Sequence, residues 1–344
     1  MSGGTVRSFG YYRPESPPPG LTMPTRLQRL DRYQQEHPWL ALPVAVIRKY
    51  VDDQGGNLAA LVAYFAFVSV FPLLLVSVAI LGFVLQGNES LQHEIVNSTL
   101  SKLPGIGDQL HANPASLRGS GIALAIGILT AVWAGMGITQ ATQSAFNRVW
   151  GVPFKDRPDF VTQRLRGIAV LSVLSLIALA SFGLTGLVTA AVPGALTRVG
   201  GYLVGVVVNV ALYLVAFRLL TACRPSWRVN LPGAVFAALF WQLLQVAGAT
   251  YTKHVIDKDQ RAYGIFGLVL GMLALLYLGA QATVIAAEIN VVHSRRLWPR
   301  SITTTPATPA DRAALRQSAE IEERIVEECV EVSFAPKQAG PDGH

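Results

Sequence analysis

Two charged residues stand inside long stretches of sequence that otherwise carry no charge. Arg218 and Glu288 each lie about one helical turn before the end of an apolar stretch, at residues 201–222 and 266–292. A charge inside a membrane-spanning segment is costly and often marks an ion pair, a proton relay or a substrate path. We predict an Arg218–Glu288 ion pair or a shared polar network that includes Asn290. The alternative is that Arg218 extends to the membrane surface and Glu288 faces water there.

Uncharged polar side chains form a second candidate site. Gln140, Gln143 and Asn147 recur at helical spacing near the end of the apolar stretch 122–145, so they share one helix face. In one interpretation they line a hydrophilic cavity. In the other they form hydrogen bonds between helices, worth about 0.6 kcal/mol each in membrane bundles. The spacing leaves both interpretations open.

Signatures of enzymes are missing from the sequence. No histidine is spaced with another His, Cys or acid as metal ligands need, and there is no P-loop, dinucleotide fingerprint or Gly-x-Ser-x-Gly. The net charge of +7 suggests nucleic-acid binding at first sight, but the basic residues flank apolar stretches, as is typical of membrane orientation. We therefore predict no enzyme, no catalytic residue, no metal, no cofactor and no nucleic-acid partner.

The apolar stretches themselves predict an all-α, polytopic membrane protein. Hydrophobic residues make up 51% of the 344 residues and charged residues only 14%, against about 25% charged in globular proteins. A ~30 Å hydrocarbon core needs about 20 helical residues. Six stretches are long enough for a bundle of six transmembrane helices, at residues 58–85, 122–145, 168–192, 201–222, 231–251 and 266–292. Pro72 lacks a backbone N–H and should kink the first helix.

The loops between the spans predict orientation in the lipid bilayer. With the N-terminus in the cytoplasm, the inner loops hold about twice as many Lys and Arg residues as the outer loops. This bias predicts that both termini are cytoplasmic, as an even number of spans requires. The oligomeric state is left unknown.

The segments outside the spans divide the chain further. Residues 1–38 are predicted to be a disordered cytoplasmic tail, and residues 39–295 the membrane domain. Residues 39–51 suit an interfacial helix whose Arg48, Lys49, Asp52 and Asp53 stay in water, the alternative being a soluble linker. A short external helix is predicted in the first outer loop. Residues 296–344 are predicted to be a cytoplasmic tail with an acidic helix at about 311–332. We expect this helix to be solvated, the alternative being that it docks on the basic loops.

Several short motifs occur in order along residues 40–295. They are LAALVAYF at 58–65, SVFPLL at 69–74, AFNRVWG at 145–151, LPGA at 231–234, YG at 263–264 and AEIN at 287–290. Together they resemble the YihY/BrkB family of bacterial inner-membrane proteins. The chain departs from the family pattern at Ala274, where a Trp is expected, and at Ala286, where members usually carry Gly.

The resemblance implies a six-helix protein of the bacterial inner membrane. The family has been linked to serum resistance and proposed to contain permeases, and some members carried a ribonuclease label now regarded as a misassignment. We expect a transporter-like protein that moves a lipid, a lipid-linked or a small polar substrate without nucleotide hydrolysis. The alternative is a structural or assembly protein of the cell envelope.

Overall fold

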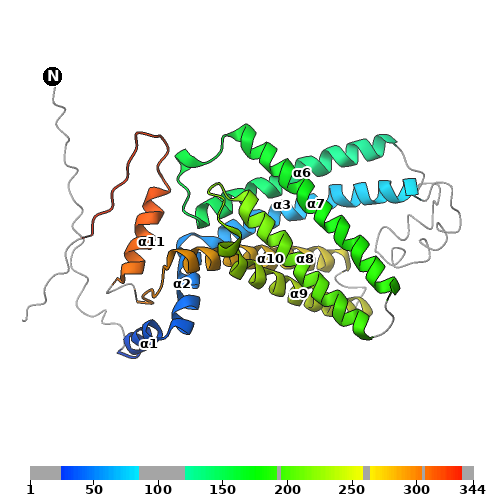
Figure 1. Cartoon of the computed structure of the whole chain (residues 1–344). Helices are drawn as coiled ribbons and strands as arrows, with labels where there is room; N and C mark the ends of the chain where they lie inside the picture. The colour runs from blue at the N-terminus through cyan, green and yellow to red at the C-terminus, as the bar shows by residue number, and fades with distance from the viewer. Residues whose placement is uncertain (1–24, 85–120, 192–194, 259–263, 304–306, 335–344) are drawn as a thin grey trace, which may run out of the picture.

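The computed structural model describes residues 25–84, 121–191, 195–258, 264–303 and 307–334 (Figure 1). Within these residues the secondary structure is helical, without strands, as predicted. The helices are α1 Thr25–Glu36, α2 Pro38–Asp52, α3 Gly55–Val84, α6 Gly121–Val149, α7 Phe160–Ala191, α8 Ala195–Leu220, α9 Trp227–Lys258, α10 Gly264–Arg295 and α11 Pro309–Glu320. A short 3-10 turn, Phe154–Asp156, lies between α6 and α7.

Six of these helices, α3 and α6 to α10, are long and apolar enough to cross a membrane. This confirms the prediction of six spans. Most of the six also extend beyond the predicted stretches; α9, for example, starts at Trp227 and runs to Lys258. The extra turns hold polar residues, because a helix can continue its backbone hydrogen bonds beyond the end of an apolar stretch.

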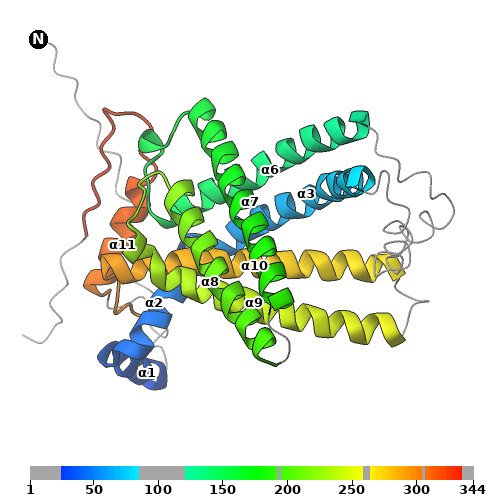
Figure 2. The same ribbon diagram turned by 45° about the vertical axis from the view of Figure 1, so that its right-hand side comes forward.

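Helix α10 is the central element of the bundle. It packs against α9 and α3, while α3 pairs with α6, and α7 and α8 continue the bundle beyond α9. Figure 2 shows α10 between α3 and α9, with α7 crossing obliquely. Both α2 and α11 lie at one end of the bundle, where α10 finishes (Figure 1). We call this the basic end, because it carries Arg148, Lys155, Arg228, Arg295 and Arg300.

The buried core gathers at the basic end. Phe146 of α6 and Phe217 of α8 are fully buried, with ring centroids 5.1 Å apart. Small residues such as Ala59, Ala237 and Ala287 fill the contacts between helices and let the backbones approach closely. Large apolar side chains instead remain exposed on the outer faces of the spans, as a bilayer requires: Leu129, Trp133, Leu176, Val207 and Leu243.

The N-terminal region is more ordered than predicted. Residues 25–36 form α1, whose Asp31 is only 5% exposed. The Asp31 carboxylate accepts hydrogen bonds from the Ile302 backbone N–H (2.8 Å) and the Ser301 hydroxyl (2.8 Å). Its helix therefore depends on contacts with a segment far away in sequence, which composition alone does not reveal. The rest of the predicted tail, residues 1–24, lies outside the described residues.

The C-terminal region also differs from its prediction. The helix α11 ends at Glu320, well before residue 332. Instead of remaining solvated, the following chain packs on the loop after α6, where the backbone N–H groups of Phe154 and Lys155 donate to the Ile321 and Glu323 carbonyls (3.1 and 3.0 Å). These backbone bonds join segments that lie far apart in the sequence, which helical periodicity does not predict.

Two predicted features of the spans stay predictions. The external helix falls in residues 85–120, outside the described residues. Pro72 lies inside α3, which continues through it as one helix, and Ser69 donates its hydroxyl to the Phe65 carbonyl (2.7 Å) rather than to the Val68 carbonyl that Pro72 leaves free. The kink at Pro72 therefore remains an expectation.

Candidate functional site

Glu288 is the most deeply buried acid of the bundle. It lies on α10 with a side-chain exposure of 0%, and its Oε2 is 3.2 Å from the ammonium nitrogen of Lys49. Lys49 reaches it from α2, where Ala45, Val46 and Lys49 are all buried against α10. The pair joins a helix that precedes the spans to the helix at the centre of the bundle.

Three acceptors from three helices surround the Lys49 ammonium. Besides Glu288, it contacts the Asp53 carboxylate and donates to the Val149 carbonyl at the end of α6 (2.8 Å). An ammonium has three N–H donors, and the last carbonyls of a helix lack partners within that helix. The Lys49–Asp53–Glu288 cluster therefore holds α2, α6 and α10 together at the basic end.

The predicted Arg218–Glu288 ion pair is wrong. Arg218 donates to the Pro225 carbonyl (3.1 Å) and lies over the Trp227 ring, 4.9 Å from its centroid. Their positions in the two apolar stretches predict the same depth for both residues, but depth does not fix the direction in which a side chain points. Arg218 turns toward the connection that follows its own helix, close to the alternative that the sequence left open.

The expectation that Lys49 and Asp53 stay in water is also wrong. Both side chains are about 5% exposed or less. The sequence does contain a signal: Leu42, Val46, Lys49 and Asp53 recur at the three- and four-residue spacing of one helix face. Since lysine usually faces solvent, the hydrophobic pattern alone assigned this position to the polar face.

Asn290 and Asn147 have structural partners. The Asn290 side-chain oxygen accepts from the Gly233 N–H (2.7 Å), and that of Asn147 accepts from the Ala222 N–H (2.8 Å). Both residues are buried. Each amide thus satisfies a backbone group on a neighbouring helix or at its end, as buried polar groups require.

Gly233 shows why its LPGA motif faces the AEIN motif. A Cβ at Gly233 would collide with the Ala286 carbonyl oxygen and would also lie 2.6 Å from the amide atoms of Asn290. Only glycine lets α9 approach α10 so closely. The two motifs therefore form one contact between helices.

The glutamines of α6 give partial support to the hydrogen-bond interpretation. Gln143 is buried and its amide donates to the Gln163 carbonyl (3.2 Å), across to α7. Gln140 is half-buried. Neither of the two cavities at the basic end is lined by Gln140, Gln143 or Asn147. The cavity that these residues were expected to line remains a proposal.

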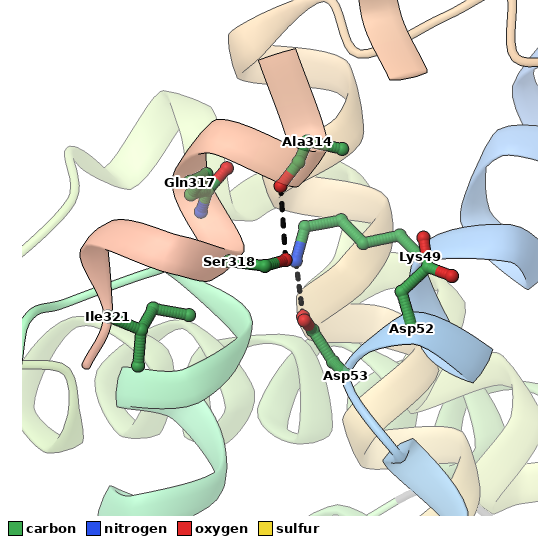
Figure 3. Close-up of a pocket in the computed structure, with 7 residues that line it drawn as sticks. All are labelled: Lys49, Asp52, Asp53, Ala314, Gln317, Ser318 and Ile321. Atoms are coloured by element: carbon green, nitrogen blue, oxygen red, sulfur yellow. Dashed lines mark hydrogen bonds and ion pairs between the residues drawn. The ribbon is translucent and has the colours of Figure 1, made fainter. Parts of the chain in front are cut away.

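A small cavity does adjoin the charged cluster. It measures about 10 Å³ and lies between Lys49, Asp52 and Asp53 on one side and Gln317, Ser318 and other α11 residues on the other (Figure 3). This volume is near the minimum that holds one water molecule. Helix α11 thus covers the side of the cluster that points away from the spans.

A second polar cluster anchors α11 in that place. The Arg300 side chain, 3% exposed, forms ion pairs with Asp311 of α11 (2.9 Å) and Asp52 of α2 (2.7 Å). Thr308 caps α11 and exchanges hydrogen bonds with Asp311 in a capping box. Burial raises the pKa of the Asp311 carboxyl group, but hydrogen bonds from Arg300, Thr308 and Ser301 outweigh this effect and lower the pKa below its usual value.

Metal ligands do not gather in the described part of the chain, where no group of three or more His, Cys, Asp or Glu side chains is placed to hold an ion. The charged cluster around Lys49 contains its own cation in the ammonium group.

Comparison with known proteins gives one family match over most of the chain. The model of the virulence factor BrkB family matches residues 46–310. Inner membrane protein YhjD of Escherichia coli is 25% identical over 74% of this chain and 81% of its own length. A UPF0761 membrane protein of Pseudoalteromonas translucida is 26% identical over 77% and 88%. Putative ribonuclease-like protein YfkH of Bacillus subtilis is 24% identical over 73% and 94%. No solved structure matches the chain.

Proposed function

The chain belongs to the virulence factor BrkB family of membrane proteins, and from that premise we propose that it is a transporter-like protein of the bacterial inner membrane. Its substrate would be a lipid, a lipid-linked molecule or a small polar compound. The sequence has no nucleotide-binding motif, so movement would be passive or driven by a gradient.

The observation that carries the proposal is the burial of the Lys49–Asp53–Glu288 cluster beside the spans. A charged side chain in the membrane interior costs about 2.5–3.5 kcal/mol on insertion scales, and a buried ion pair is weak evidence for stability. Apolar residues would hold α2 against α10 at least as well. Because burying these three charges costs free energy without a clear gain in stability, their presence supports a role for them in transport.

The same premise supports a chain without enzymatic activity. One relative is named ribonuclease-like, but hydrolysis of RNA commonly uses acids or histidines grouped around metal ions. The described residues include no such group, and the Glu288 carboxylate is closed off from bulk water. We propose that the ribonuclease description does not extend to this chain.

A flux measurement on reconstituted vesicles tests the proposal. The probes are fluorescently labelled phosphatidylglycerol, followed by chemical quenching of the outer leaflet, and a panel of small polar solutes, followed by entry. The wild-type chain should accelerate at least one of these, and Glu288→Gln should reduce that flux at least tenfold because the buried charge is gone.

The matched control is Glu322→Gln, which removes an acid whose side chain is 54% exposed and should leave the flux unchanged. Monodisperse elution and an unchanged helical spectrum would show that both variants fold. Equal flux for wild type and folded Glu288→Gln would reject the role of Glu288.

A second candidate is a structural or assembly protein of the envelope, and one observation favours it. The cavity next to the charged cluster has room for about one water molecule, and α11 covers it. Such a closed end suits a scaffold that binds partners through residues 88–118 or 309–334. Crosslinking of partners that is lost when either segment is replaced, with no flux for any probe, would select this candidate.

A further inference from the structure

The charges around Lys49 do not balance. One ammonium faces two carboxylates, Asp53 and Glu288, and the three side chains are between 0% and 5% exposed. If all three were ionised, the cluster would carry one uncompensated negative charge away from water. The two carboxyl groups also act on each other directly, so full ionisation would add repulsion between them.

Three other charged side chains of these helices form contacts outside the cluster. On α2, Asp52 pairs with Arg300 (2.7 Å). On α6, Arg148 pairs with Glu322 (3.6 Å). At the end of α10, Arg295 donates to the Trp150 carbonyl (2.8 Å).

Helix α3 and the C-terminal residues at the cavity offer no cation. Helix α3 contains no Lys, Arg, Asp or Glu, and the cavity residues from α11 and its C-terminal cap are uncharged, namely Ala314, Gln317, Ser318 and Ile321. The titratable neighbour Tyr50 is a neutral phenol whose pKa is raised by burial, Tyr277 and the Glu288 carboxylate. Among the contacts described for the cluster, Lys49 is its only positive charge.

We propose that Asp53 and Glu288 together hold one exchangeable proton at neutral pH, which makes the cluster a proton-binding site with Lys49 as its fixed cation. One proton balances the charge and removes the repulsion between two carboxylates that share one ammonium. A metal ion is disfavoured because the ammonium already occupies the position between the acids. The site stands whether or not the chain transports a substrate.

The cavity beneath α11 adjoins the cluster on its outer side and has room for about one water molecule. It is lined by Asp53 and Lys49, while Glu288 lies behind Lys49 and outside the lining. A proton arriving from the basic end would therefore meet Asp53 first, beside Lys49 (Figure 3). Glu288 would receive a proton when Lys49 gives it one of its own and takes the proton of Asp53 in exchange. Asp53 is the outer member of the site and Glu288 the inner member.

Infrared spectroscopy of the full chain in lipid nanodiscs tests the proposal, because a protonated carboxyl group has a carbonyl stretching band that ionised carboxylates lack and that shifts in D2O. The wild-type chain at neutral pH should show this band at an intensity of about one group per molecule. Glu288→Gln and Asp53→Asn should each abolish it, since one ammonium then faces one carboxylate.

Lys49→Met gives a prediction of opposite sign. Without the ammonium, both acids should be protonated and the band should roughly double. Glu327→Gln, which removes an exposed acid, should leave it unchanged. A wild-type spectrum without the band, or a band that persists in both Glu288→Gln and Asp53→Asn, would overturn the proposal. The band with no flux for any probe would reject transport and keep the proton site.

Discussion

At the residue scale, close contacts between helix backbones explain the positions of two buried asparagines and one glycine. Asn290 closes the backbone of α9 at Gly233, and Asn147 closes the backbone after α8 at Ala222. Both amides sit on helices that flank the charged cluster. The polar residues of the basic end therefore form two groups. The asparagines accept hydrogen bonds from backbone N–H groups, whereas Lys49, Asp53 and Glu288 form a cluster of buried charges.

Gly233→Ala is expected to destabilise the protein. The new methyl group would meet the Ala286 carbonyl oxygen, so α9 and α10 must separate, at a cost of about 1–3 kcal/mol for overpacking. Gly201→Ala on α8 is the matched control, since nothing lies within 4 Å of its Cβ position and alanine favours a helix. Thermal unfolding in detergent should show a lower Tm for the first variant only; equal Tm values would contradict this contact.

Of the charged cluster, only Glu288 could be singled out from the sequence, and its partners could not. A lone acid near the end of an uncharged stretch was enough to single out Glu288. The residue that binds it, Lys49, lies 239 positions earlier in a segment that the pattern left in water. Charge and spacing give the depth of a residue, whereas its partner depends on how α2 docks on α10.

At the element scale, α11 is held by contacts that depend on ionised acids. Hydrogen bonds from Ile302, Ser301 and Gln34 outweigh burial and lower the pKa of Asp31, as similar bonds do for Asp311. A group with a lowered pKa in the folded state stabilises the fold above its unfolded pKa. That contribution is lost as the pH falls through the folded pKa, below about pH 4.

Acid should therefore loosen α11 and the chain that follows it. A spin label on the exposed Cys329, in a Cys223→Ser background, should become more mobile between pH 7 and pH 3. Asp311→Asn should produce the same mobility already at pH 7, while Glu327→Gln should not. Label mobility that changes with neither acid nor Asp311→Asn would contradict this account of the docking.

The elements themselves were predicted unevenly. The six spans followed from long uncharged stretches, because hydrocarbon excludes charge from any helix that crosses it. The helices α1 and α11 have polar sequences and are stabilised through Arg300 and its neighbours. The placement of α2 on the membrane surface stays a prediction, although Trp39, Ile47 and Val51 are all more than 60% exposed.

At the scale of the whole molecule, the described N-terminal and C-terminal helices lie at the same end of the bundle (Figure 1). Six spans require this arrangement whichever way the protein faces. By the positive-inside rule, the excess of Lys and Arg at that end predicts that it faces the cytoplasm. The proton site and its cover would then face the cytoplasm, which is the central claim of this account.

The two native cysteines allow a direct test of that orientation. Cys223 and Cys329 are both exposed thiols at the basic end. A membrane-impermeant maleimide should leave them unlabelled in intact cells with the outer membrane permeabilised, and label both in inside-out vesicles. A cysteine introduced at Asp108, in the predicted outer loop, should show the reverse pattern in a chain without the native thiols. Labelling of Cys329 in intact cells would contradict a cytoplasmic basic end.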